Sequence, residues 1–482
     1  MDSITVGLDF GTHQTKICIQ RTADEGRGQS SYEFFKFKDL NGNDSYFLPS
    51  IMQINKDDTL SFGFVNPDNA KSHPEKPKLE MEPVFKEIDI EDTARQLCGK
   101  YMVDKNDALA VDSIKQMLIC RNDILRRANS EEIARIREEN LEKQVQYWNT
   151  ITTYRYFKQA TFTEREWKGT IDSDTVCVWY LAYVLFCLEE KFGTDFSINM
   201  GVPADSNSFD EKKRKAVTLL LTAYYLVEDV YHNKIEAFLS EKVDSLKEKT
   251  KYRFCTAQLK FDYNIKVFPE AYASMISLTS RGRLTPAGMC MSVDIGGGTT
   301  DISFFTILGK EPLIYKFWSL DKGLNYIAEE SGFDYQDCSF DKFANKKVIN
   351  DFNQSRVELY NRLIGDLYQK LSRETSIDKS NLTAALDNRI LVYNGGGSSF
   401  PSLTVKTGTF TAVVLVEEEM WKNENVKEKE AVASICHLLN TSYGLSVGKN
   451  DERIPLCEFS ELFGNLPNEK KVSNDFVDKD MC

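Results

Sequence analysis

One short stretch of the chain joins two acids, three glycines and two threonines within a single turn. In "VDIGGGTTDISFF", residues 293–305, Asp294 ends an apolar segment and Asp301 follows the glycines and threonines. Glycine lets backbone N–H groups approach anionic oxygens closely, and threonine hydroxyls add further donors. An acid beside a phosphate is reasonable only when a divalent cation such as Mg²⁺ lies between them. The stretch therefore predicts a phosphate-binding turn with a magnesium ion beside it.

The same arrangement occurs at the start of the chain. In "VGLDFGTHQTK", residues 6–16, Asp9 ends an alternating apolar segment and is followed by a glycine and a threonine. A third glycine turn lies in "LVYNGGGSSFP", residues 391–401. Each apolar segment has the alternation of a β-strand. Three strands that each end in a glycine turn predict one polyphosphate ligand, with Asp9 and Asp294 as partners of a hydrated Mg²⁺.

The common alternatives for phosphate binding do not match the spacing. The chain contains no GxxxxGK[ST] sequence, which excludes a Walker-type loop, and no GxGxxG that opens a helix, which excludes the dinucleotide fingerprint. "GGGTTD" continues into a strand instead, so the phosphate grip is expected in a hairpin turn.

The composition is that of a folded, acidic protein. The chain has 482 residues, of which 41% are hydrophobic, and its net charge is -13. This length predicts two or three domains, and the negative charge argues against nonspecific binding to nucleic acid. No apolar run approaches the roughly 20 residues that cross a bilayer. The scattered cysteines without CxxC pairs, and the absence of a signal peptide, predict a cytoplasmic protein without membrane contact.

The elements that would position these turns alternate between strands and helices. Strand–turn–strand units open both halves of the chain, which predicts two similar α/β domains. Residues 108–195, 210–227 and 320–380 read as mostly helical, and 428–444 as a late helix. Polar or charged segments at 66–107 and 229–262 read as insertions, the second of them helical.

These motifs resemble those of the superfamily that contains actins, sugar kinases and the 70-kilodalton heat-shock chaperones. "VGLDFGTHQTK" is similar to the first phosphate motif, "VDIGGGTTDIS" to the second as the chaperones write it, and "LVYNGGGSSFP" to the adenosine motif. "YFLPSIM", "INMGVPADSNSFDEKKRKAV" and "VFPEAYASM" also fit the chaperone branch, and the motifs follow the family order over roughly residues 1–445.

The resemblance implies an actin-like ATPase fold in which two ribonuclease-H-like domains flank a nucleotide cleft. It places domain I at 1–285 and domain II at 286–428, with a segment at 429–466 that returns to domain I. A polar, flexible tail is expected at 467–482.

The resemblance also implies the ligands, ATP with Mg²⁺, and roles for individual residues. Asp9 and Asp294 match the metal-coordinating acids, and the alternative is that they are ordinary turn acids. The residues that would contact phosphate are Gly11, Thr12, His13, Gly296, Gly297, Gly298, Thr299 and Thr300, and those that would contact adenosine are Gly396, Gly397 and Ser398. His13 is as well explained as a polar turn residue. No arginine follows the adenosine motif, so Phe400 either stacks on the base or fills the core.

Two lysines compete for the phosphate contact. Lys16 lies where actins and plasmid-segregation actins carry a phosphate-binding lysine, and Lys115, in "SIKQMLI", lies in a context similar to the lysine that the chaperones use. A solvated surface role is the alternative for both. Glu270 follows a proline, as in divergent members, whereas many chaperones have a glutamate where Phe268 stands. Glu270 would orient the water that attacks the γ-phosphate, or serve only as an acid at a helix N-terminus.

Three functions fit these residues. The first is a slow, chaperone-like ATPase that acts as a nucleotide-dependent switch for a protein partner. A peptide-binding domain is not expected, because the chain ends at residue 482, soon after the last expected helix. The second is a filament-forming segregation ATPase, which Lys16 and Glu270 favour and which makes oligomers possible. The third is a small-molecule kinase, for which no substrate acid-base residue stands out. A pseudoenzyme that binds nucleotide without hydrolysis is also compatible.

Overall fold

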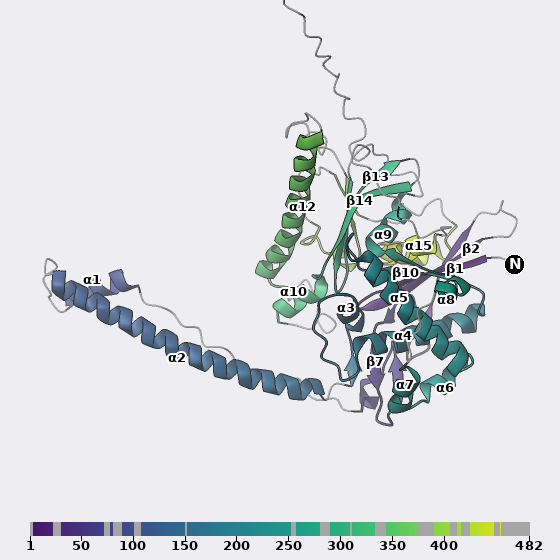
Figure 1. The fold of residues 1–482 in the computed structure, drawn as a ribbon, viewed down its shortest axis with the longest axis horizontal. Helices are drawn as coiled ribbons and strands as arrows, with labels where there is room; N and C mark the ends of the chain where they lie inside the picture. Colours follow the sequence, from purple (N-terminus) through teal and green to yellow (C-terminus); the bar gives the residue numbers. More distant parts are fainter. Residues whose placement is uncertain are drawn as a thin grey trace, which may run out of the picture. The chain divides into compact units, whose positions relative to one another are not determined.

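The computed structural model divides into two compact units, which are described separately. One unit comprises residues 1–71, 153–167 and 171–482, and the other comprises 72–152 and 168–170. The described residues are 3–22, 30–71, 78–80, 89–100, 108–149, 152–251, 257–279, 290–308, 311–332, 344–374, 390–404, 412–415, 425–447 and 454. The predicted tail at 467–482 lies outside them. Helices and sheets alternate along the chain, which confirms the α/β class (Figure 1).

The first unit contains a sheet built mainly from the N-terminal part of the chain. Its strand order is β11-β10-β1-β2-β3, and β6 pairs with β2 beyond this path. The strands are β1 (Ser3–Phe10), β2 (Gln14–Thr22), β3 (Ser31–Phe34), β6 (Leu48–Pro49), β10 (Ser197–Val202) and β11 (Ile265–Pro269). β1, β2 and β3 are antiparallel neighbours, whereas β1, β10 and β11 run parallel.

A second sheet of the same unit repeats this topology. Its order is β14-β13-β12-β15-β16. The strands are β12 (Cys290–Ile295), β13 (Thr300–Leu308), β14 (Glu311–Leu320), β15 (Ile390–Asn394) and β16 (Ala412–Leu415). Three antiparallel strands are again followed by two parallel ones. The duplicated strand–turn–strand unit predicted from the sequence is therefore present, and it extends to five equivalent strands in the two sheets, with β6 as an additional strand of the first.

The two opening hairpins also share their register. Asp9 on β1 lies opposite Lys16 on β2, and Asp294 on β12 lies opposite Asp301 on β13. In each hairpin the first acid is the penultimate residue of its strand. At this equivalent position the first hairpin pairs an acid with a base, whereas the second hairpin pairs two acids.

Helices on one side of the first sheet form its main core. They are α3 (Phe157–Phe162), α4 (Ser173–Phe192), α5 (Phe209–Tyr224), α6 (Ile235–Leu239), α7 (Val243–Lys249) and α8 (Ala257–Asp262). α4 begins where the Asp172 carboxylate accepts the N–H of Thr175, and it ends at Gly193, whose φ is +72°. Because α4 is buried on nearly every side, it is apolar almost throughout. The predicted helical character of 210–227 is confirmed, with a π-helical turn over Tyr225–Val230. That of 229–262 is confirmed in its described part, which contains α6, α7 and α8, whereas 252–256 lie outside the described residues.

Helices α9 (Glu270–Thr279) and α15 (Cys436–Ser446) pack between the two sheets (Figure 1). α15 contacts β1, β2 and α9, and α9 contacts β12, β13 and β14. Two glycines permit this close packing: a Cβ on Gly444 would strike the carbonyl of Ala273 in α9, and one on Gly7 would strike the backbone of α15. The late helix predicted at 428–444 begins as a short α14 (Lys429–Val432), passes through a 3-10 turn at Ala433–Ile435 and continues as α15.

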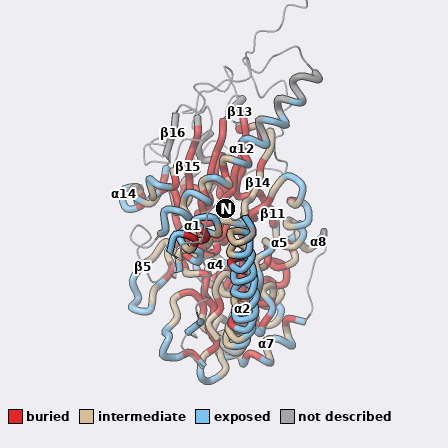
Figure 2. The backbone as a smooth tube through the Cα atoms, turned by 90° about the vertical axis from the view of Figure 1, so that its left-hand side faces the viewer, coloured by how far each residue is buried: buried red, intermediate tan, exposed pale blue. Residues whose placement is uncertain are grey.

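The second sheet is covered on both faces. Successive residues of a strand point to opposite sides, so Phe305 joins the core shared with α9 while Phe304 packs toward α10 (Leu324–Glu330) and α12 (Lys346–Glu374). The described parts of β12, β13 and β15 are accordingly largely buried, whereas most of the described residues of β14 are half-buried (Figure 2). Smaller sheets join β4 (Phe37–Lys38) to β5 (Asp44–Ser45), and β7 (Met52–Ile54) to β8 (Leu60–Phe62) and β9 (Thr153–Tyr154).

The second unit consists of α1 (Ile90–Lys100) packed against the long helix α2 (Ala108–Asn149). Ala94 and Cys98 of α1 are buried, as are Leu118 and Asn122 of α2. None of the helices in the described part of the chain is both long enough and apolar enough to span a membrane. The predicted domain boundaries stay predictions.

Candidate functional site

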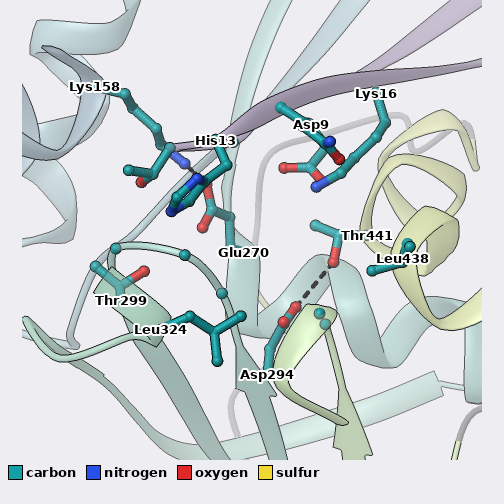
Figure 3. Close-up of a pocket in the computed structure, with 18 of the residues that line it drawn as sticks. Asp9, His13, Lys16, Lys158, Glu270, Asp294, Thr299, Leu324, Leu438 and Thr441 are labelled. Carbon is teal, nitrogen blue, oxygen red and sulfur yellow. Dashed lines mark hydrogen bonds and ion pairs between the residues drawn. The ribbon is translucent and has the colours of Figure 1, made fainter. Parts of the chain in front are cut away.

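A cavity of about 730 Å³ lies in the first unit, where the turns of the two equivalent hairpins meet (Figure 3). This volume is within the range of small-molecule sites. The predicted residues that line it are Asp9, Gly11, Thr12, His13, Lys16, Glu270, Asp294, Gly296, Gly297, Gly298, Thr299 and Gly396. Residues far apart in the sequence are therefore brought to one cavity. The wall also includes Asp301 of the second glycine motif, and Lys158, Leu438 and Thr441, which the motifs did not indicate.

The first glycine turn is held from outside the cavity by Ser50. The Ser50 hydroxyl donates to the Gly11 carbonyl at 2.7 Å, and the Ser50 N–H donates to the His13 carbonyl at 2.8 Å. A Cβ on Gly11 would strike the carbonyl of Gln14. The turn therefore requires glycine, and its carbonyls are already paired.

The second glycine turn is held by the start of α10. The N–H groups of Leu324 and Asn325 donate to the carbonyls of Gly296 and Gly297 at 3.0 and 2.8 Å. These two carbonyls therefore point at α10. Gly323 lies directly against the same turn, where a Cβ would come within 2.6 Å of both carbonyl oxygens. The turn and α10 consequently form one rigid piece.

The two turns touch each other across the cavity. A Cβ on Gly297 would strike the His13 ring, and His13 hydrogen bonds through Nε2 to the Asn325 side chain. The Thr12 hydroxyl oxygen also lies close to Gly298, at 2.6 Å from the position of a Cβ on that residue. His13 is therefore a contact between the two hairpins, as well as a residue of the wall.

Asp9 and Asp294 face the cavity from different sides (Figure 3). The Lys16 ammonium pairs with Asp9 at 3.0 Å, and the Thr441 hydroxyl donates to Asp294 at 3.0 Å. Burial, together with the negative charges of Asp9 and Glu270, raises the pKa of Asp294 to about 7. The pKa of Asp301 is also raised well above its ordinary value, first by burial and then by Glu270 and Asp294. The carboxylates thus crowd one another.

Glu270 and Lys158 form a buried ion pair at the inner end of the cavity. Their Oε1 and Nζ atoms are 2.5 Å apart, and the side chains are only 10% and 3% exposed. Burial raises the pKa of Glu270, and Asp9 adds to this against the opposing charge of Lys158. For Lys158, burial alone would lower the pKa, but Glu270 and Asp9 outweigh it and the pKa is raised. The carboxylates around the Lys158 ammonium thus account for the raised pKa of Lys158 and, together with burial, for that of Glu270.

The acids around the cavity make it a suitable environment for a divalent cation. Asp9, Glu270, Asp294 and Asp301 line it together with only two lysines, Lys16 and Lys158. Within the described residues no three His, Cys, Asp or Glu side chains are grouped to hold a metal by themselves. Mg²⁺ keeps several waters and contacts protein through one or two carboxylates. The donor set therefore fits a hydrated Mg²⁺ shared by Asp9 and Asp294, and it does not fit a metal fully enclosed by protein ligands.

The other end of the cavity is formed by the third glycine turn. Gly395 has φ +76°, and a Cβ there would strike the Asp294 carboxylate. Gly396, Ser399 and Phe400 line the cavity with Leu438 of α15. Phe400 also packs against the core of the second sheet, as the core role predicted, and its stacking on a base stays a prediction.

Three predicted binding residues lie behind the wall and do not line it. The Thr300 hydroxyl donates to the Lys322 carbonyl at 2.7 Å, and the Ser398 hydroxyl donates to the Gly395 carbonyl at 2.7 Å. Gly397 packs against the Ile295 side chain, where a Cβ would collide. Thr300, Gly397 and Ser398 therefore shape the turns through these contacts, and their direct contact with a ligand stays a prediction.

The two candidate lysines have different places. Lys16 lines the cavity, whereas Lys115 belongs to the second unit, where its ammonium pairs with Glu91 of α1 at 2.7 Å. Lys158 is the second lysine of the cavity, and sequence reasoning missed it. The signal available was a charged residue inside the aromatic stretch "YRYFKQATF" at 154–162.

Comparison of the sequence with models of protein families gives no match. Comparison with curated proteins gives none either. Membership of the actin and heat-shock chaperone superfamily therefore remains a hypothesis that is based on the sequence motifs.

Proposed function

We propose that the protein binds Mg-ATP and hydrolyses it slowly, and that its nucleotide state is read by a protein partner. The observation that carries this proposal is the convergence of two equivalent hairpins on one cavity, with Asp9 and Asp294 at matching positions. If either turn had only a structural role, nothing would require both turns to lie at the same cavity.

We also propose that the fold is the actin-like ATPase fold. Two sheets with the same order of three antiparallel and two parallel strands support it, as do the helices α9 and α15 packed between them. The cavity between the hairpin turns is where that fold would hold its nucleotide. The chaperone branch is favoured by the motifs alone.

The residues of the chain have distinct tasks in binding. The glycine turns would offer backbone N–H groups to phosphate oxygens. The Lys16 side chain lines the same cavity, and its ammonium would add a positive charge beside the phosphates. Asp9 and Asp294 would hold the waters around Mg²⁺. When bound, Mg²⁺ neutralises phosphate charge and thereby makes the γ-phosphate easier to attack. The third turn, with Phe400 and Leu438, would accept the adenosine.

Glu270 and Lys158 are suited to the hydrolytic step. Glu270 would accept a hydrogen bond from the attacking water, and its raised pKa brings its proton affinity closer to neutrality. Lys158 fixes the Glu270 carboxylate in one orientation through their 2.5 Å contact. In this type of reaction a protein contributes mainly positioning and electrostatic stabilisation, and a held acid that orients the attacking water is one part of this.

A filament-forming ATPase is the second candidate, because Lys16 lines the cavity as the corresponding lysine of segregation actins would.

Two measurements test these proposals. Binding of Mg-ATP should be measured by calorimetry, and phosphate release should be measured without an added acceptor, both in wild type and in Asp294→Asn. Binding and release in wild type, with loss of both in the variant, support the proposal. No binding by wild type refutes it. ATP-dependent sedimentation would favour the filament, and phosphate release only with an added acceptor would favour a kinase.

A further inference from the structure

Two adjacent residues of α3 contact two different parts of the cavity. Lys158 pairs with Glu270, which follows the last strand of the first sheet. The Gln159 amide donates to the Gly298 carbonyl, in the glycine turn of the second sheet, at 2.9 Å. Because the residues are neighbours on one short helix, a shift of the second turn is passed to Lys158 through the backbone of α3.

The Gln159 side chain also contacts α10. Its Oε1 atom accepts from the Asn325 amide and from the Arg165 guanidinium, both at 3.4 Å. Gln159 is only 4% exposed. Since α10 and the second glycine turn form one piece, Gln159 binds that piece at two points. A buried amide that lost its Gly298 and Asn325 partners would be costly, so Gln159 favours the arrangement in which the second turn and α10 lie against α3; we call this the closed arrangement.

An ion pair extends the same connection outward. Arg165 pairs with Glu329 of α10 at 2.5 Å, and its guanidinium lies 4.7 Å from the Tyr156 ring centre. Tyr156 precedes α3 with φ +61°, a left-handed conformation that is strained for a tyrosine. Strain of this kind persists where surrounding contacts fix the backbone, and it is concentrated at functional sites.

We infer, on the basis of the proposed function, that Gln159 is a positioning residue that couples closure of the second glycine turn to the orientation of Glu270. When the second turn closes on the nucleotide, Gln159 holds α3 in place, and Lys158 then holds Glu270 toward the water. When the turn moves away, α3 is released and the Lys158–Glu270 pair loosens. Hydrolysis is thereby restricted to the closed arrangement, and the ATP and ADP states differ at α3.

The test compares Gln159→Leu with Gln20→Leu. Gln20 is also buried, at 8% exposure, and its amide donates to the Tyr32 hydroxyl at 3.0 Å, but both residues belong to the first sheet. The matched change removes a buried amide whose hydrogen bond to Tyr32 joins two neighbouring strands of the first sheet. Dissociation constants for Mg-ATP and Mg-ADP, the single-turnover rate of hydrolysis, and hydrogen exchange of α3 in both nucleotide states are measured for each protein.

Gln159→Leu removes the hydrogen bonds of Gln159 with Gly298, Asn325 and Arg165, of which the first, at 2.9 Å, is the short one and the other two are at 3.4 Å. It should lower the single-turnover rate about tenfold, the net effect of one good hydrogen bond, and should change the dissociation constant for Mg-ATP less than about threefold. It should also remove the difference in exchange of α3 between ATP and ADP. Gln20→Leu should retain the wild-type rate and the difference. If Gln159→Leu keeps the wild-type rate and the difference in exchange of α3, while wild type binds and hydrolyses Mg-ATP, this inference is wrong and the proposed function stands. If wild type binds no nucleotide, the function itself fails.

A second pair of variants keeps the inference testable if Gln159→Leu does not fold. Arg165→Glu reverses one charge at the exposed end of the connection, and Arg165→Glu with Glu329→Arg restores a pair of opposite sign. The single change should slow single-turnover hydrolysis two- to threefold, on the order of a weak exposed ion pair, and the double change should recover the wild-type rate. Equal rates in all three proteins, or no recovery in the double variant, would overturn the coupling.

Discussion

The raised pKa of Asp294 makes a prediction that needs no nucleotide. Burial, Asp9 and Glu270 raise this pKa from 3.8 to about 7, so the folded protein resists ionisation of the group. At one pKa unit per 1.36 kcal/mol, the full shift corresponds to about 4 kcal/mol. Asp294 is only half-buried because it faces the cavity, so solvent screening reduces the figure. We expect Asp294→Asn to stabilise the nucleotide-free protein by about 2–4 kcal/mol at pH 8.

The sign of the pH dependence follows from the direction of the shift. Below about pH 4 the group is protonated in both folded and unfolded chains, and it contributes nothing. Between about pH 4 and pH 7 the unfolded chain releases the proton while the folded chain retains it, so wild-type stability falls as the pH rises. Above pH 7 the penalty is fully present. The gain from Asp294→Asn should therefore be small at pH 4.5 and largest at pH 8.

Urea unfolding at pH 4.5 and pH 8, without nucleotide or magnesium, measures this gain. The amide that replaces the carboxylate in Asp294→Asn can still accept the Thr441 hydroxyl hydrogen bond, so the variant isolates the charge. Asp244→Asn is the matched control, because the Asp244 side chain is 98% exposed, and it should change stability little at either pH. A gain that is absent at pH 8, or equal at both pH values, would show that Asp294 is not crowded by neighbouring charges.

Four further changes test other parts of the reasoning. Glu270→Gln should lower single-turnover hydrolysis about a hundredfold or more with little change in Mg-ATP affinity, measured by rapid quench and calorimetry. Lys158→Ala should destabilise the protein by about 3–5 kcal/mol in urea, because it leaves the Glu270 carboxylate buried without its cation. Glu189→Gln should stabilise the protein by about 1–2 kcal/mol at pH 8 and little at pH 4.5, because burial and Glu228 raise the pKa of Glu189 to about 7. Among the described residues, neither of its carboxylate oxygens has a hydrogen-bond partner. Urea unfolding at both pH values measures this gain. Gly444→Ala should cost about 2 kcal/mol or more, seen as a lower thermal midpoint, because α15 lies directly against α9.

Much of the local structure around the site follows from the sequence. The alternation before Asp9 and before Asp294 predicted strands, and the glycines after them predicted turns, because these properties depend on residues within a few positions of one another. The α/β class and the duplicated hairpins followed from the same patterns, and most of the expected glycine-turn residues do line one cavity.

The partners of those residues were decided only by tertiary structure. The cavity receives Lys158 from α3 and Thr441 from α15, and neither belongs to a glycine motif. Lys16 and Lys115 were equivalent as charges in the sequence, but only Lys16 lies opposite Asp9 in a strand pair. Electrostatics and hydrogen bonding depend on distances in space, and packing of α9 and α15 between the sheets sets these distances. The sequence by itself thus determined the turns and their chemistry, whereas the assembly of the sheets decided which charges surround the cavity and how strongly they perturb one another.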